Sequence, residues 1–440
     1  MSVNMPSAIV RRGLFQSLRF ELAFVLLAGC ALPIFALAVA EAGLPTNEPL
    51  ALQLVPAIEW ISTVPAANST VGVAVCALVS IAALRRLRFY AGAAVARSIM
   101  PVVSIAFALL VAIIGGLRFE YSSKVLIVGY IGILLARFAI TAMRSRSRGL
   151  FYYLVPGGQV GIVAQMKSAP VMFLDQPSLA GLPDCAIVAD LYAEIEPEWE
   201  RFLAEAAISG RPVYHYKQLW EAETGKVQIE HLSENGFGAL VPSFGYQKIK
   251  RTIDVGLTIL LLPVLVPVIA VCAVAIKLDS EGSVFFRQRR MGFRGQEFEV
   301  LKLRTMRECH AGEDRALSIT QDADKRVTKI GAFLRKTRLD ELPQFVNILK
   351  GEMSWIGPRP EAVSLSQWYE AEIPFYRYRH IVRPGISGWA QVNQGHVADV
   401  EEVDEKLQYD FYYIKNLSYW LDILIALRTI KVMFSGFGAK

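Results

Sequence analysis

The sequence predicts a membrane protein in three parts: an α-helical membrane bundle, a small α/β domain, and an α+β domain with one further membrane helix. Three observations predict this architecture. Of the 440 residues, 53% are hydrophobic and 20% are charged, whereas typical soluble domains are about 25% charged. The apolar residues gather in long uncharged runs. Elsewhere, short strand-like and helix-like segments alternate. The expected parts are residues 1–149, 150–245 and 246–440.

The first part contains four apolar runs, at residues 22–40, 61–84, 98–117 and 125–143. Each is long enough to cross a hydrocarbon core about 30 Å thick. Arginines precede the first run and follow the second and the fourth, whereas residues 41–60 carry glutamates and no Lys or Arg. Because cytoplasmic loops carry the excess of Lys and Arg, both ends of the bundle are expected on the cytoplasmic side.

One charge, Arg137, lies inside the fourth run. A charge at this depth is costly and often marks a functional pathway. The alternative is that its long side chain snorkels to the cytoplasmic end, about two turns away. The snorkelling interpretation is favoured.

Residues 150–245 read as a small α/β domain. Strand-like runs at 171–174, 185–190 and 213–216 surround a helix-like stretch at 196–210, an order that indicates a parallel sheet. The Pro156-Gly157-Gly158 turn lacks the G-x-G-x-x-G pattern of a dinucleotide site. A degenerate Rossmann-like spacer is therefore expected here, with His215 and His231 as surface or packing residues.

The apolar run at residues 253–276 is long enough to span a membrane, yet Lys and Arg stand on both sides of it. Both ends are therefore expected at the cytoplasmic face. Pro263 and Pro267 fall near its middle, where proline removes a backbone donor and bends a helix. A re-entrant helix hairpin broken at Pro263 satisfies both observations. A fifth, kinked crossing is the alternative, and it would carry the following domain outside.

The last part combines a basic stretch with a pair of carboxylates. Seven Lys and Arg residues within residues 285–307 form an anion-binding surface, for a substrate or for acidic lipid headgroups. Nucleic acid is a poorer fit, because no recognised nucleic-acid motif accompanies them. Asp340 and Glu341 stand at a helix start marked by Pro343, beside further arginines. Two such carboxylates can share a divalent metal, and one can attack phosphorus as a nucleophile.

From about residue 248 onward the chain resembles the bacterial sugar transferase family, the monotopic phosphoglycosyl transferases. Besides the proline-broken helix, five motifs carry the resemblance in one order, and they read Gln288-x-Arg290-x-Gly292, Lys302-x-Arg304-Thr305-Met306, Leu339 to Gln344, Gly357 to Pro360, and Pro384 to Gln391. The bundle and the spacer resemble the longer polyprenyl glycosylphosphotransferases in architecture alone.

The resemblance implies transfer of a hexose 1-phosphate from a UDP-sugar, UDP-glucose or UDP-galactose, to undecaprenyl phosphate. UMP is released, and the product begins an exopolysaccharide or O-antigen type glycan. The enzyme would work at the bacterial cytoplasmic (inner) membrane, with its catalytic domain on the cytoplasmic face among membrane lipids. A non-catalytic scaffold of polysaccharide assembly is the alternative, and the N-terminal bundle is a candidate homodimer element.

Carried onto this chain, the resemblance makes Asp340 the nucleophile of a covalent intermediate and Glu341 its partner, as a base or as a ligand, with Asp340, of Mg²⁺. The residues expected to contact substrate or phosphate are Arg335, Arg359, Arg383, Lys302, Arg304, Gln288 and Arg290. One departure concerns the basic turn that follows W-A-Q-V-N in many members, because this chain has Gln394-Gly395-His396 there. Residues 404–434 are expected to form one or two amphipathic interfacial helices, and a buried helix of a soluble domain is the alternative.

Overall fold

The computed structural model describes residues 17–42, 55–87, 95–146, 152–166, 171–182, 185–228, 244–307, 326–394 and 400–435. The chain divides into two compact units, residues 1–223 and 224–440. His231 and His396 lie outside the described residues.

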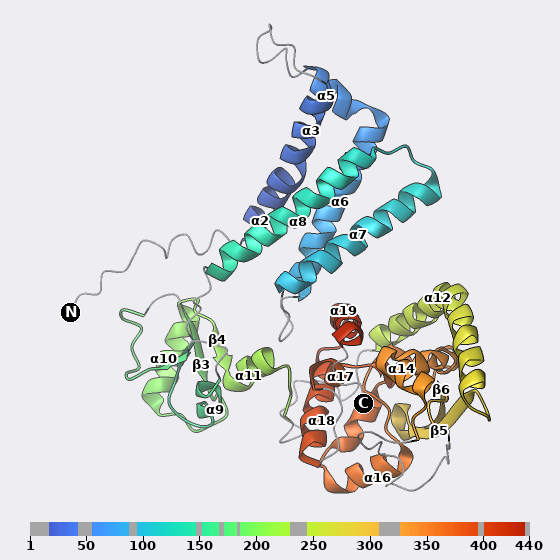
Figure 1. Cartoon of the computed structure of the whole chain (residues 1–440). Helices are drawn as coiled ribbons and strands as arrows, with labels where there is room; N and C mark the ends of the chain where they lie inside the picture. Colours follow the sequence, from blue (N-terminus) through green and yellow to red (C-terminus); the bar gives the residue numbers. More distant parts are fainter. Residues whose placement is uncertain are drawn as a thin grey trace. The chain divides into compact units, whose positions relative to one another are not determined.

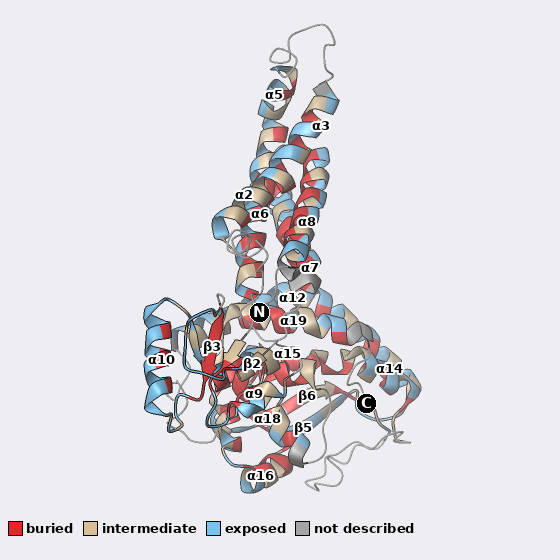
Figure 2. Ribbon diagram, turned by 90° about the vertical axis from the view of Figure 1, so that its left-hand side faces the viewer, coloured by how far each residue is buried: buried red, intermediate tan, exposed pale blue. Residues whose placement is uncertain are grey.

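The bundle of the first unit contains the four predicted apolar segments (Figure 1). The first is built from α2 (Leu18–Leu26), the π-helical turn η1 (Leu27–Ala31) and α3 (Leu32–Ala42), and the others are α6 (Val64–Leu87), α7 (Val95–Leu117) and α8 (Ser123–Arg146), with the short α5 (Val55–Ser62) before α6. Exposed and buried residues alternate around these helices (Figure 2). Outward side chains such as Leu109 and Leu135 are more than half exposed, as expected of surfaces that face lipid.

Small residues let η1 and α8 pack closely. A Cβ added at Gly132 would lie 2.3 Å from the carbonyl oxygen of Gly29, so only glycine fits there. Such close backbone approach is typical of helix packing in membranes.

The favoured interpretation of Arg137 was wrong, because this side chain does not snorkel. It is completely buried in α8, and its guanidinium pairs with Glu21 of α2. The other carboxylate oxygen of Glu21 lies 2.9 Å from Arg85 Nε, at the end of α6. The ion pairs therefore join three helices of the bundle.

The α/β region has a four-stranded parallel sheet in the order β2-β1-β3-β4. Its strands are β1 (Tyr152–Leu154), β2 (Val171–Phe173), β3 (Ala186–Ala189) and β4 (Val213–His215), and its helices are α9 (Gly161–Ala164), α10 (Pro197–Ile208) and α11 (Tyr216–Thr224). The parallel sheet was predicted, but β1 was not. Alternate residues of β3 enter two cores: Ile187 packs with Phe202 of α10, and Val188 packs with Leu219 of α11. The sheet is therefore covered on both faces.

The glycine turn after β1 is closed by a carboxylate of the protein. Gly157 and Gly158 have φ values of 132° and 54°. Asp190, just after β3, accepts the backbone N–H of Gln159 at 3.0 Å and that of Tyr192 at 3.2 Å. A Cβ at Gly158 would lie 2.3 Å from the Asp190 carboxylate. The N–H of Gln159, which a phosphate loop would direct at its ligand, is directed at Asp190.

The second unit begins with α12 (Phe244–Asp279), a long helix that contains both predicted prolines. Figure 1 shows α12 bent into two arms. The C-terminal arm packs Ile269, Cys272 and Ile276 against the rest of the domain. Other faces are bare, since Leu260 is 74% exposed and Val271 is 71% exposed. The helix therefore has one face for the domain and a broad apolar face that is largely exposed among the described residues.

The rest of this unit is an α+β arrangement. The hairpin β5 (Phe285–Met291) and β6 (Glu297–Leu303) is antiparallel, with the 3-10 turn η3 (Phe293–Gly295) between the strands, and β7 (Ser354–Ile356) pairs in parallel with β8 (Gly385–Ser387). The helical elements are α14 (Lys329–Thr337), η4 (Leu339–Gln344), α15 (Phe345–Lys350), α16 (Val363–Glu372), η5 (Tyr376–Ile381), α17 (Trp389–Asn393), α18 (Val400–Lys415) and α19 (Tyr419–Ser435).

The two predicted C-terminal helices are α18 and α19. They differ in burial, because α18 buries the run from Phe411 to Ile414 whereas α19 leaves Ile423 and Ile430 exposed. The alternative of a buried helix thus describes α18, and an interfacial position is retained as a prediction for α19.

Candidate active site

The carboxylate pair lies in a short 3-10 turn between two helices. Arg338 ends α14 in the left-handed conformation, with φ of 56°, and η4 begins at the next residue. Pro343 is inside η4, and α15 follows directly. This geometry buries both Asp340 and Glu341, which are 9% and 4% exposed. The predicted start of a helix at this pair is confirmed.

Glu341 is held by cations on one of its two oxygens. Its Oε1 lies 2.7 Å from Arg359 Nη2 and 3.1 Å from Lys302 Nζ. Its Oε2 is buried without a hydrogen bond, and Arg338 Nη1 lies 3.9 Å from it. Burial by itself would raise the pKa of Glu341, but Arg359 and Lys302 outweigh it and hold that pKa well below its usual range. Glu341 is therefore ionised, and its Oε2 can accept a hydrogen bond or bind a metal ion.

Asp340 differs from its neighbour. Its carboxylate has no hydrogen bond or ion pair with any residue that the structure describes. Burial and the adjacent Glu341 charge raise the pKa of Asp340 to about 6, against the opposing charges of Lys302, Arg359 and Arg335. A buried carboxylate without donors is poorly stabilised as an anion, which favours reaction with an electrophile.

The Gly357–Pro360 segment positions Arg359. Backbone hydrogen bonds tie it to the β8 segment, from Gly357 N to Ser387 O at 2.8 Å and from Gly385 N to Pro358 O at 2.9 Å. A Cβ at Gly385 would lie 2.1 Å from Gly357 N, so glycine is required for this approach. The two glycine-containing motifs thus form one structure behind Arg359.

Further cations hold the carbonyl groups of the same segment. Arg379 is fully buried between Asp410 and Tyr376, and its Nη2 donates to the carbonyl of Arg359 at 2.9 Å. Arg290 donates to the carbonyl of Pro360 and, at 2.7 Å, to Gln288 Oε1. Gln288 and Arg290 therefore support the Arg359 loop from the β5 side.

The remaining predicted residues divide into two groups. Arg335 acts on Asp340 electrostatically and donates through Nε to Thr305 Oγ1 at 2.9 Å. Arg304 instead bonds to Ser280 and Glu281 at the end of α12, at 2.7 Å from Nη2 to the Ser280 carbonyl. Arg383 donates through Nε to Gly351 O at 3.0 Å, beyond α15. The structure thus brings Lys302, Arg335 and Arg359 to the carboxylates, and holds Arg304 and Arg383 at other contacts.

Sequence reasoning missed the residues that support the site from behind. These are Arg379, Asp410, and the Glu361–Lys406 ion pair. Glu361 directly follows the Gly357–Pro360 motif, and this adjacency was an available signal. Arg379 and Asp410 are 31 residues apart in sequence, and no local pattern links them.

The two carboxylates are suited to Mg²⁺. Mg²⁺ binds through one or two carboxylates together with substrate phosphates and water. Asp340 and the unpaired Oε2 of Glu341 supply oxygen ligands of this kind. Among the described residues no group of three or more His, Cys, Asp or Glu side chains gathers for a metal. The pair fits an ion that is completed by phosphate oxygens rather than one enclosed by protein.

Comparison with known proteins agrees with the motifs. The family model described as bacterial sugar transferase matches residues 245–436. A UDP-N-acetylgalactosamine-undecaprenyl-phosphate N-acetylgalactosaminephosphotransferase of Aeromonas hydrophila is 43% identical over 85% of this chain and 88% of its own length. UDP-glucose:undecaprenyl-phosphate glucose-1-phosphate transferases of Escherichia coli and Caulobacter vibrioides are 43% and 42% identical over 44% of this chain each, covering 41% and 72% of their own lengths.

The match to the Aeromonas relative is longer than the second unit and therefore includes part of the first, whereas each of the other two matches is shorter than the second unit. Its identity and coverage identify the family for most of the chain. Five helices in the described part of the chain are long and apolar enough to cross a membrane. The scaffold alternative is set aside, because the matched proteins are enzymes. The chain belongs to the bacterial sugar transferase family and is a membrane-bound transferase.

Proposed function

We propose that this protein transfers a hexose 1-phosphate from a UDP-sugar to undecaprenyl phosphate through a covalent intermediate on Asp340. The observation that carries this proposal is a buried carboxylate with no hydrogen-bond partner among the described residues, next to a Glu341 that Lys302 and Arg359 keep ionised. Such a carboxylate is a suitable nucleophile for phosphorus. The names of the relatives support the two substrates.

The first step forms the intermediate. A carboxylate oxygen of Asp340 bonds to the sugar-linked phosphorus, the phosphorus–oxygen bond to the nucleotide breaks, and UMP leaves with that oxygen and the bonding electrons. Charge builds up on the phosphoryl oxygens and on the leaving UMP. Lys302, Arg335 and Arg359 are the cations that offset it.

The second step returns the enzyme to its first state. An oxygen of undecaprenyl phosphate bonds to the same phosphorus, the bond to Asp340 breaks, and the product is undecaprenyl-diphosphate-sugar. Mg²⁺ bound by Asp340 and Glu341 would neutralise phosphate charge during both steps. Arg379 and Arg290 keep Arg359 in place throughout, through its own carbonyl and that of Pro360.

We further propose that α12 is a re-entrant hairpin and that the catalytic domain lies on the cytoplasmic face of the inner membrane. Lysines and arginines flank the helix on both sides, Pro263 and Pro267 lie within it, and its bare apolar face suits lipid. Cysteines introduced just before Lys248 and just after Lys277 should both label from the cytoplasmic side. A label from the opposite side at either position would instead support a fifth, kinked crossing.

The sugar is the open choice among UDP-sugars. Glucose and galactose are expected from the family resemblance, but the relative that matches most of the chain is named for N-acetylgalactosamine. The test is UMP release by the purified full-length protein with undecaprenyl phosphate, Mg²⁺ and, in turn, UDP-N-acetylgalactosamine, UDP-glucose and UDP-galactose. We expect one of them to react at least about tenfold faster than the others, because lost polar contacts are costly to a buried site. No UMP release with any of the three would contradict the proposal.

The covalent intermediate has its own test. Without undecaprenyl phosphate, the protein incubated with its UDP-sugar should gain the mass of one hexose phosphate. The gain should be absent in Asp340→Asn and present in Glu405→Gln, a carboxylate of α18 that pairs with Lys226. A mass gain in Asp340→Asn would move the nucleophile to another residue. The Rossmann-like character of the α/β region and a homodimer through the bundle stay predictions.

A further inference from the structure

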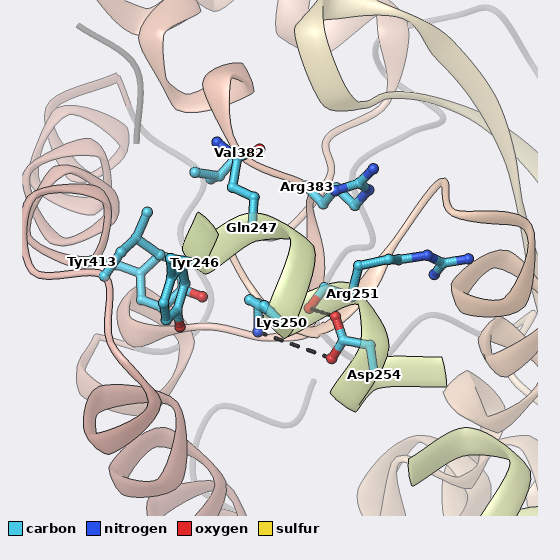
Figure 3. A pocket seen from close by; sticks show the side chains of 10 residues that line it. Tyr246, Gln247, Lys250, Arg251, Asp254, Val382, Arg383 and Tyr413 are labelled. Carbon is cyan, nitrogen blue, oxygen red and sulfur yellow. Dashed lines mark hydrogen bonds and ion pairs between the residues drawn. The ribbon is translucent and has the colours of Figure 1, made fainter. Parts of the chain in front are cut away.

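A pocket lined by charged, aromatic and apolar side chains lies on the second unit, around the N-terminal arm of α12 (Figure 3). It has an empty volume of about 360 Å³, part of which is open to solvent. Its walls come from α12, from the segment before β8, and from the end of α18. The residues of its wall include Lys250, Arg251, Asp254, Arg383 and Leu417. Neither Asp340 nor Glu341 lines it.

The acidic groups at this pocket are already paired within the protein. Ser354 Oγ donates to Asp254 at 2.7 Å. Lys250 Nζ lies 2.7 Å from Asp422, a residue of α19 that also accepts hydrogen bonds from the hydroxyls of Tyr246 and Tyr413 at 2.9 Å. These contacts hold the walls of the pocket in place, and Asp422 neutralises the charge of Lys250.

The arginines are not neutralised in this way. Arg251 donates to the carbonyls of Ile348 and Leu349, and Arg383 donates through Nε to that of Gly351, so both bind neutral groups at the end of α15. No described residue accepts a hydrogen bond from the two terminal amino groups of Arg383. Its guanidinium lies over the Phe293 ring at 4.9 Å. Figure 3 shows the side chains of Arg251 and Arg383 extending to the same side of the pocket.

The local field at Arg383 is positive. Burial, and the like charges of Arg251 and Arg294, lower the pKa of Arg383, while Asp254 acts in the opposite direction. Because guanidinium groups stay charged in proteins, such crowding favours an anion at this position.

The pocket adjoins the start of the apolar part of α12. The exposed apolar side chains Ile253, Leu257 and Leu260 follow Arg251 along the helix. A ring contact between Tyr246 and Tyr419 joins the same arm to α19. Charged groups followed by lipid-facing residues, with tyrosines beside them, are typical of headgroup depth.

We propose that this pocket binds the phosphate of a membrane lipid, with the terminal amino groups of Arg383 as donors. Two lipids carry this chemistry: an anionic phospholipid such as phosphatidylglycerol, and undecaprenyl phosphate. The second source rests on the proposed function, and the first does not. Asp340 lies near the start of η4, whereas Arg383 bonds to Gly351 just beyond the end of α15, so the site is separate from the catalytic carboxylates.

The test measures lipid retained by the full-length protein, without UDP-sugar. The protein is placed in phosphatidylcholine nanodiscs doped with either phosphatidylglycerol or undecaprenyl phosphate, and bound lipid is counted by native mass spectrometry after release. Arg383→Gln should reduce retention of at least one dopant about tenfold, because it removes charge-assisted hydrogen bonds. Leu417→Trp should do the same by filling the pocket while every cation stays. Leu417→Trp is the variant that tests the proposal if Arg383→Gln fails to fold.

The matched control is Arg377→Gln, which removes the same charge from an exposed side chain of η5. Its retention of both dopants should equal that of the unchanged protein. Loss confined to phosphatidylglycerol identifies a phospholipid, loss confined to undecaprenyl phosphate identifies the acceptor lipid, and loss of both shows one site for either. Retention equal to that of the unchanged protein in all three variants, or equal loss in the Arg377→Gln control, overturns the proposal. Because no transfer is measured, an inactive protein that binds phosphatidylglycerol contradicts the proposed function alone.

Discussion

Two glutamates in this protein are buried among cations, and they are used in opposite ways. In the bundle, Glu21 gives one oxygen to Arg137 and the other to Arg85, and both oxygens are therefore paired. In the catalytic unit, Glu341 takes Arg359 and Lys302 on a single oxygen and leaves the other without a hydrogen bond. The Glu21 cluster is closed in the sense that both carboxylate oxygens have a cationic partner. The Glu341 cluster keeps an oxygen that can accept a further hydrogen bond or bind a metal ion.

The difference separates a structural charge cluster from a reactive one. Removing one partner of a buried ion pair is costly, because it leaves a buried charge without compensation. In the Glu21 cluster both carboxylate oxygens are paired, and the pairs join three helices. In the Asp340–Glu341 cluster, one carboxylate has no partner among the described residues. The unmet groups are those that substrate phosphate and Mg²⁺ would complete.

The largest expected effect is on catalysis. Asp340→Asn should lower UMP release by at least roughly a thousandfold, as loss of a nucleophile does in other covalent enzymes. Its stability should be equal or higher at neutral pH, because burial raises the pKa of Asp340 and its ionised form therefore disfavours folding. UMP release and thermal unfolding in the same detergent measure both. Activity close to that of the unchanged protein would exclude Asp340 as the nucleophile.

The Glu21 cluster should show the reverse, because a substitution there should lower stability and leave catalysis unchanged. Glu21→Gln leaves Arg137 buried without a countercharge, and should lower the free energy of unfolding by about 3–5 kcal/mol. UMP release per folded molecule should be unchanged. Unfolding in mixed micelles measures the loss, and Glu21→Gln combined with Arg137→Met should recover most of it. A full loss in the double variant would mean that the pair is not the source of the stability.

A change within the reactive cluster should give a smaller effect. Arg359→Lys keeps the charge but loses the planar guanidinium that reaches Glu341, and UMP release should fall about 10- to 100-fold. The matched control is Arg289→Lys on β5, whose side chain is 64% exposed and pairs with Glu297. It should keep full activity. If Arg359→Lys kept as much activity as Arg289→Lys, charge alone, without the guanidinium geometry, would be what the site requires.

The sequence was most informative where a pattern is local. The apolar runs, the two prolines of α12, and the adjacent Asp340 and Glu341 each follow from a few neighbouring residues, and the structure has these elements at those positions. The short strand β1 was not predicted, although β2 and β4 are equally short and were.

Pairs of side chains that lie far apart in the sequence could not be predicted from it. Arg137 was expected to snorkel toward the cytoplasmic end, because no local pattern points to its partner Glu21, which lies 116 residues away at the start of another helix. Arg383 was grouped with Arg359 because both stand next to a proline in a motif. In the folded protein Arg383 bonds to Gly351, whereas Arg359 bonds to Glu341. Residue type predicted a cation, but only the packed structure decides which anion or carbonyl it meets.

The smallest effect is expected at a third carboxylate–cation pair, Lys226 with Glu405. This pair ties the start of the second unit to α18, next to the hydrogen bond from Val227 N to Gln408 O at 3.0 Å. The Glu405 side chain is 43% exposed, so water and salt screen the attraction. Lys226→Ala should therefore cost at most about 1 kcal/mol of unfolding free energy, and less as salt is raised. A loss as large as that of Glu21→Gln would contradict burial as the property that ranks the three clusters.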